Sequence, residues 1–201
     1  MTVLKEARIS RKALQHNLDF FMDKAGERKI LACVKAYGYG HGFYEIMPVL
    51  SQADGCYVHT WDAALRLRRD WPDLKIVLAG FPGSATLLEH LAEEQIDWVV
   101  YDHSQLALIQ AMPKQNKSII VWLKVDTGMH RLGFLPEEIP QVMRLVGQSP
   151  WVRDVVLMTH FSCSHDRRSP SNHQQAKTFQ KVLANYPHHY TSLGNTAVAF
   201  N

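Results

Sequence analysis

Residues 30–42 read Ile-Leu-Ala-Cys-Val-Lys-Ala-Tyr-Gly-Tyr-Gly-His-Gly. The apolar run at residues 30–34 is short and bounded, which predicts a buried strand. Lys35 would then project from the C-terminal end of that strand, where burial is costly because an ammonium group loses its solvation. A Schiff base to an aldehyde cofactor would remove that cost and use the nucleophilicity of the amine. A surface lysine before an ordinary loop is the alternative.

Similar apolar, β-rich runs alternate with amphipathic segments along the rest of the chain. We expect further strands at residues 56–59, 75–79, 98–101, 118–125, 155–159 and 190–194, and helices at residues 11–25, 61–70, 85–94, 137–147 and from 171 or 172 to 186. Strands that alternate with helices predict parallel βαβ units. Seven strands at this spacing favour an α/β fold of the (β/α)8 TIM-barrel type over a doubly wound sheet, although the count is one strand short of a closed barrel.

Composition places the chain among ordinary soluble domains. Its 201 residues predict one domain, and 46% hydrophobic and 20% charged residues are typical of a globular protein. A net charge of +3 argues against a nucleic-acid partner. We expect no membrane span and no signal peptide, hence a cytoplasmic location. The histidines lack a metal-ligand spacing, so we expect no metal, and Cys33, Cys56 and Cys163 are expected to be small buried hydrophobes.

Four blocks in the right order resemble the alanine racemase family. Residues 34–42 are similar to its pyridoxal 5′-phosphate (PLP) lysine motif V-K-A-N-A-Y-G-H-G, with Tyr37 where the family has Asn and Gly38 where it has Ala. Residues 124–133, Lys-Val-Asp-Thr-Gly-Met-His-Arg-Leu-Gly, resemble K-V-D-T-G-M-x-R-L-G. Residues 158–161 resemble M-T/S-H-F, and residues 194–197 are a weaker match to S-N-S-A. On these blocks the chain is identified as a member of the family.

This resemblance implies an enzymatic function and indicates which domain of the enzyme the chain represents. Residues 1–201 would be the PLP-binding barrel domain of an enzyme that racemises L-alanine to D-alanine for peptidoglycan synthesis. The chain looks truncated before the eighth strand and the C-terminal β domain of the family, so alone it is expected to be inactive. The parent enzyme would be a homodimer, and the truncated form could hide its open sheet edges by strand exchange.

The resemblance also implies roles for individual residues near the cofactor. Lys35 would form the Schiff base and act as one of the two racemisation bases, and Tyr39 would hydrogen-bond the cofactor phosphate. Arg131, at the end of the fifth strand, would contact the PLP phenolic oxygen and the substrate carboxylate, because arginine offers a fixed, charged donor fork. Met129 would lie near the substrate. Alternatively, Tyr39 is a packing tyrosine in a turn, Arg131 forms a surface ion pair, and Met129 is an ordinary core methionine.

Four further residues complete the implied site. Lys124, on the same strand as Arg131, would be carbamylated so that its negative charge orients the arginine; this needs a buried amine with a depressed pKa. His160 would end the sixth strand, although its family partner, an arginine of the eighth strand, lies outside the chain. Asn195 and Thr196 would end the seventh strand and bind the cofactor, with Thr196 in the place of the family's phosphate-binding serine.

Two other functions remain open on the sequence alone. A single-domain PLP-binding homeostasis protein also carries a Schiff-base lysine on a barrel, and the short chain favours it. An inactive barrel fragment is the second alternative.

Overall fold

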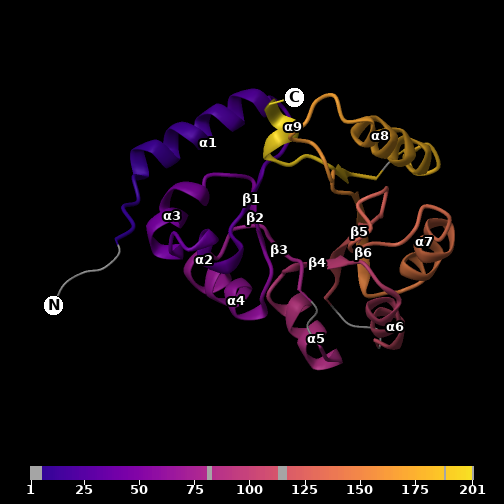
Figure 1. Ribbon diagram of the computed structural model, residues 1–201. Helices are drawn as coiled ribbons and strands as arrows, with labels where there is room; N and C mark the ends of the chain where they lie inside the picture. The colour runs from indigo at the N-terminus through magenta and orange to yellow at the C-terminus, as the bar shows by residue number, and fades with distance from the viewer. Residues whose placement is uncertain (1–5, 81–82, 113–116, 188, 201) are drawn as a thin grey trace. The chain divides into compact units, whose positions relative to one another are not determined.

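The computed structural model describes residues 6–80, 83–112, 117–187 and 189–200. The chain divides into two compact units, residues 1–80 and residues 81–201. In both units strands alternate with helices along the chain (Figure 1). Every strand pairing within a unit is parallel, which confirms the α/β class predicted from the sequence.

The first unit contains a parallel sheet whose strands pair in chain order. The strands are β1 (Leu31–Cys33), β2 (Gly55–Val58) and β3 (Ile76–Leu78), and the helices are α1 (Arg11–Ala25), α2 (Lys35–Tyr39), α3 (Phe43–Leu50) and α4 (Trp61–Asp70). The side chain of Ser10 caps α1 by accepting the N–H of Ala13, and Gly26 closes that helix with a positive φ. The bounds of α1 match the helix expected at residues 11–25.

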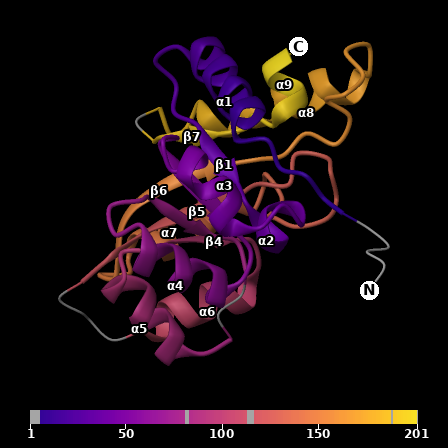
Figure 2. The ribbon, with the colours of Figure 1, turned by 90° about the vertical axis from the view of Figure 1, so that its left-hand side faces the viewer.

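The second unit repeats the same pattern. Its strands β4 (Asp97–Val100), β5 (Ile119–Lys124), β6 (Val152–Met158) and β7 (Thr191–Ser192) also pair in chain order. Its helices are α5 (Ala85–Glu93), α6 (His103–Ala111), α7 (Ile139–Gly147), α8 (Pro170–Leu183) and α9 (Thr196–Phe200). Figure 2 shows β5 and β6 running side by side. The two strands are the longest of this unit; Lys124 lies on β5, and Met129, Arg131 and His160 lie in the loops that follow the two strands.

The core of the second unit lies in its strands. All residues of β4 are buried, and β5 is buried throughout except for one half-buried position. Strands of parallel sheets bury both faces, so they appear in the sequence as continuous apolar runs. One polar link crosses this core: the indole N–H of Trp122 donates to the Asp97 carboxylate over 2.9 Å, which joins β5 to β4.

The structure corrects several expected boundaries and two burial predictions, since Cys163 is half-buried and Cys33 is exposed. Helix α7 begins at Ile139 rather than at residue 137, because residues 136–138 form a turn, and α8 begins at Pro170, before the expected start. The helices α2, α3, α6 and α9 were not anticipated. Cys33 is exposed, contrary to expectation, since β1 is half-buried to exposed along its length and pairs only with β2 in the described part of its unit.

Candidate functional site

Lys35 does not project from a buried strand end. It lies two residues beyond β1, begins α2 and is exposed, so the desolvation cost expected from the sequence does not arise. Its Nζ atom lies 5.5 Å from the centroid of the Tyr39 ring, a cation–π contact. The amine is therefore accessible and held over an aromatic face, rather than buried and isolated.

The turn that follows Lys35 is left-handed. Residues 36 to 39 have φ values of 50°, 54°, 67° and 56°, and the N–H of Gly40 donates to the carbonyl of Ala36 over 3.0 Å. Each residue with a Cβ costs about 1–2 kcal/mol in this conformation, and Gly38 is the one glycine of the four. Strained backbone of this kind clusters at functional sites. Here the turn brings the Tyr39 ring next to the amine of Lys35.

The hydroxyl of Tyr39 lies 3.3 Å from the thiol sulfur of Cys33. Burial raises the pKa of Tyr39 to about 12, with further contributions from the hydrogen bond to Cys33 and the charge of that group. A phenol is protonated across the physiological range even at its ordinary pKa of 10.0, so Tyr39 can donate a hydrogen bond to an anionic group.

In the second unit, Lys124 is the last residue of β5 and is only 7% exposed. Burial lowers the pKa of Lys124, the positive charge of Arg131 lowers it further, and the carboxylate of Asp126 opposes both. The structure thus brings Lys124 and Arg131 within electrostatic range. The expectation that both residues lie on one strand is wrong, because β5 ends at Lys124 and Arg131 is exposed in the loop beyond it.

Asp126 organises the start of that loop. One oxygen of its carboxylate, Oδ1, accepts the backbone N–H groups of Gly128, Met129 and His130, each over 3.0 Å. Burial acts to raise the pKa of Asp126, but these N–H groups and the nearby His130 ring outweigh it, so the pKa lies below its usual value. The fixed turn holds the half-buried Met129 and leads directly into Arg131.

The same loop is closed at its far end by backbone contacts. The N–H of Phe134 donates to the carbonyl of Lys124 over 2.9 Å, and the N–H of Asp126 donates to the carbonyl of Phe134 over 2.8 Å. A Cβ on Gly133 would lie 2.7 Å from the backbone nitrogen of Asp126. Glycine is therefore required at residue 133 for the two chain segments to approach.

The remaining expected residues lie beyond strand ends rather than on them. His160 is half-buried two residues after β6, and its carbonyl accepts the side-chain amide of Gln175 over 3.0 Å. Asn195 follows β7 by three residues; its Oδ1 accepts the hydroxyl of Ser164 over 2.9 Å and the N–H of Val198 over 3.1 Å. Thr196 is exposed at the first position of α9.

Sequence reasoning missed three buried polar residues of this unit. Thr127, Thr159 and Gln175 are 6%, 3% and 1% exposed and are hydrogen-bonded to one another in a chain. The available signal was the position of Gln175 on α8, where it shares the buried face with Phe179 and Val182. A polar side chain at such a position must find partners, because an unpaired buried amide is costly.

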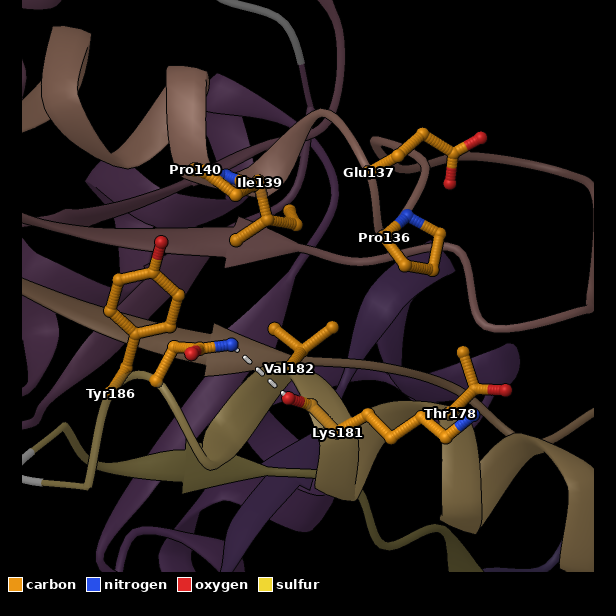
Figure 3. Close-up of a pocket in the computed structure, with 9 residues that line it drawn as sticks. Pro136, Glu137, Ile139, Pro140, Thr178, Lys181, Val182 and Tyr186 are labelled. Carbon is orange, nitrogen blue, oxygen red and sulfur yellow. Dashed lines mark hydrogen bonds between the residues drawn. The ribbon is translucent and has the colours of Figure 1, made fainter.

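A groove of about 400 Å³ lies on the second unit away from these residues. It is lined by Pro136, Glu137, Ile139, Pro140, Thr178, Lys181, Val182, Asn185 and Tyr186. In Figure 3 the side chains of Ile139 and Val182 point toward each other across it. None of the residues expected to bind a cofactor or substrate lines this groove.

No three His, Cys, Asp or Glu side chains in residues 6–80, 83–112, 117–187 and 189–200 gather closely enough to hold a metal ion. Within those same ranges, every helix is too short or too polar to cross a membrane.

The chain is similar to known racemases over nearly all of its length. It is 38% identical to an alanine racemase of Shewanella piezotolerans over 201 residues, which cover 99% of this chain and 55% of the relative. It is 37% identical to an alanine racemase of Shewanella loihica over 205 residues, covering 100% of this chain and 56% of that protein. The chain therefore spans about half the length of these relatives.

Solved structures of alanine racemases also match nearly all of this chain and about half of their own length. Biosynthetic alanine racemase from Pseudomonas aeruginosa matches with a TM-score of 0.85 at 30% identity, covering 94% of this chain and 52% of that one. Alanine racemase from Bartonella henselae, solved with covalently bound pyridoxal phosphate, matches with a TM-score of 0.82 at 27% identity, covering 96% and 57%. These likenesses confirm the predicted barrel-type fold class, of which seven strands are described. The family model "Alanine racemase, N-terminal domain" matches residues 9–201, and the chain belongs to that family.

Proposed function

We propose that residues 1–201 form the PLP-binding barrel domain of an alanine racemase that interconverts L- and D-alanine for peptidoglycan synthesis in the cytoplasm. The observation that carries the proposal is the exposed amine of Lys35, held 5.5 Å from the Tyr39 ring centroid by a strained turn within the family's lysine motif. Family membership and the likeness to racemase structures support it. The parent enzyme is proposed to act as a homodimer.

The donors present fit PLP, which carries an aldehyde, a phenolic oxygen and a phosphate. Lys35 offers an accessible primary amine for the aldehyde carbon, and Tyr39 offers a phenol that stays protonated. Arg131 offers a guanidinium group, which suits an anionic oxygen, while Asn195 and Thr196 offer an amide and a hydroxyl. When bound, PLP supplies an electron sink that makes the α-hydrogen of an amino acid removable.

Each residue then has a distinct task in this proposal. Lys35 Nζ takes up or returns the α-proton on one face of the substrate, and Tyr39 holds the cofactor phosphate. Arg131 holds the phenolic oxygen of the cofactor and the carboxylate of the substrate, and Met129 borders the substrate. Asn195 and Thr196 contribute to the phosphate site. His160 is proposed to orient its neighbours through hydrogen bonds.

Lys124 is proposed to carry a carbamate. Carbamylation requires the neutral amine, and burial together with the charge of Arg131 lowers the pKa of Lys124, which enriches that form. An ammonium group at residue 124 repels Arg131, whereas a carbamate attracts it. The modification would thereby turn a repulsive pair into one that orients the guanidinium group.

A fusion tests the activity of the chain within a complete enzyme. The matching N-terminal part of the Shewanella piezotolerans racemase is replaced by this chain, and the fusion is expressed in a bacterium that requires D-alanine. We expect growth without D-alanine, and loss of that growth when the fusion carries Lys35→Ala. A soluble fusion that binds PLP but does not racemise alanine would contradict the proposal and favour a homeostasis protein. A fusion that neither binds PLP nor racemises would favour an inactive fragment.

A further inference from the structure

Gln175 on α8 uses its whole side-chain amide to join two loops of the second unit. Its Nε2 donates to the hydroxyl of Thr127, after β5, over 3.1 Å and to the carbonyl of His160, after β6, over 3.0 Å. Its Oε1 accepts the backbone N–H of Ser162 over 2.9 Å and the Ser162 hydroxyl over 3.0 Å. Both donors and both acceptor positions are therefore satisfied, which fixes the orientation of the amide.

The hydroxyl groups beyond Gln175 form a chain with a single direction. The hydroxyl of Thr159 donates to the carbonyl of Val125 over 2.9 Å. Because that hydroxyl has one hydrogen, its 2.8 Å bond to Thr127 must be donated by Thr127. Thr127 in turn accepts from Gln175. Hydrogen-bond donation thus runs from α8 through both loops to the carbonyl of Val125, the residue that follows Lys124 and β5.

Packing reinforces this link. A Cβ placed on Gly128 would lie 3.3 Å from Cγ of Gln175, and φ of Gly128 is 134°. Glycine lets the loop after β5 rest directly on the stem of Gln175 in a conformation that side chains rarely adopt. The same loop continues through Met129 to Arg131, so its placement depends on α8 as well as on Asp126.

We propose that Gln175 is a positioning residue that sets the Arg131 loop and the His160 segment relative to each other, and so shapes half of the cofactor site. The inference rests on the proposed function, but its structural part stands on residues of the second unit alone. Gln175 touches neither Met129 nor Arg131 in the contacts described, so it acts through Thr127 and Gly128. Removing its donors should loosen that loop while leaving the strands intact.

Two substitutions separate the donors of Gln175 from its shape. Gln175→Glu keeps the size and the acceptors for Ser162, but a carboxylate cannot donate to Thr127 or to the His160 carbonyl. Gln175→Met keeps a similar length and loses every hydrogen bond. Gln174→Glu is the matched control, because Gln174 is the exposed neighbour on the same helix and the substitution adds the same charge.

The first readout is backbone hydrogen exchange of the unliganded chain, followed at residues 128–130 and at Ser162. For Gln175→Glu we expect exchange of the Met129 and His130 amides to accelerate about tenfold, with Ser162 and the β5 amides unchanged. For Gln175→Met we expect Ser162 to accelerate as well. Gln174→Glu should match the wild type. Unchanged exchange at residues 128–130 in both Gln175 variants would overturn the proposal.

The second readout is the affinity of the same proteins for PLP, measured by absorbance titration. We expect both Gln175 variants to bind PLP about tenfold more weakly than the wild type, and Gln174→Glu to bind normally. Accelerated loop exchange with unchanged PLP affinity would overturn the link to the cofactor site. If even the wild-type chain fails to bind PLP, the proposed function fails for this chain, while the exchange result still decides the structural part.

If the Gln175 variants fail to fold, a third variant tests the same proposal. Thr127→Val removes one hydroxyl and is nearly isosteric, so it removes two hydrogen bonds of the chain, the one from Gln175 and the one to Thr159. We expect it to accelerate exchange at Met129 and His130 without affecting Ser162. Unchanged exchange in this variant would also count against the proposal.

Discussion

At the scale of single residues, the decisive feature is a set of polar groups whose pKa values differ from their ordinary ones. Burial and Cys33 raise the pKa of Tyr39, and burial and Arg131 lower the pKa of Lys124. The Lys124 shift favours the neutral amine that carbamylation needs, whereas Tyr39 is protonated at physiological pH with or without its shift. Each can be measured in the unliganded chain, without any assay of activity.

Removing the Cys33 thiol should lower the pKa of Tyr39. We expect Cys33→Ala to move that pKa from about 12 toward its ordinary value of 10.0, because the hydrogen bond and the nearby charge are lost while burial remains. The measurement is an alkaline titration of ring-labelled tyrosine by NMR, with Tyr39→Phe to assign the signal. A Tyr39 pKa that does not change in Cys33→Ala would show that burial alone raises it.

The Tyr39 pKa also sets a direction for stability at alkaline pH. Above pH 10 the unfolded phenol loses its proton while the folded one keeps it, so the free energy of unfolding falls as pH rises toward about 12. We expect Tyr39→Phe to remove this part of the decline in denaturant titrations. An equal decline in wild type and variant would contradict the expectation.

Lys124 should react with carbon dioxide. We expect labelled bicarbonate to give a carbamate signal by carbon NMR in the wild-type chain, because the lowered pKa supplies neutral amine. The signal should vanish in Lys124→Met. The pH dependence has a definite sign: between its folded pKa and 10.5 the unfolded lysine binds more protons, so the free energy of unfolding rises with pH there. A carbamate signal that persists in Lys124→Met would exclude residue 124 as its source.

At the scale of elements, α2 is the least ordinary part of the fold and the least predictable. Its helical label covers a left-handed turn that no propensity pattern indicates, because three of its four positive-φ residues carry a Cβ. The strands were easier to predict from the sequence than α2, because buried parallel strands are bounded apolar runs. The observed starts of α7 and α8 differ from the predicted ones. A three-residue turn precedes α7, and both helices have proline among their first residues, so the sequence does not mark the first helical residue clearly.

Gly38 gives a direct test of packing between α2 and α3. A Cβ at residue 38 would lie 2.1 Å from Cδ1 of Ile46, and φ there is 67°. We expect Gly38→Ala to lower the free energy of unfolding by about 1–2 kcal/mol, measured by chemical denaturation. Ile46→Val removes the obstructing atom, so the double variant should lose less than the sum of the two single losses. Strict additivity would show that only the backbone conformation matters.

Ala36 should respond to glycine in the opposite sense from an ordinary helical alanine. At φ 50°, Ala36→Gly relieves a Cβ clash, and we expect the free energy of unfolding to rise by about 0.5–1 kcal/mol. The control, Ala13→Gly in α1, should lower it by a similar amount. Destabilisation by both substitutions would contradict the left-handed turn.

At the scale of the whole molecule, the candidate site was only partly readable from the sequence. The lysine and arginine positions came from four matched blocks, and the fold class followed from strand spacing. The hydrogen-bonded chain through Thr127, Thr159 and Gln175 could not be read, because it joins residues 48 positions apart in sequence. Such links depend on which loops a helix covers, and that is decided by tertiary packing.

The central claim for the whole chain is that it holds PLP through Lys35. The most direct test is borohydride reduction of the chain in the presence of PLP, followed by peptide mapping with mass spectrometry. The account predicts that the pyridoxyl group is found on the peptide containing Lys35 and that labelling is lost in Lys35→Ala. Labelling confined to other lysines, or labelling unchanged in Lys35→Ala, would contradict it.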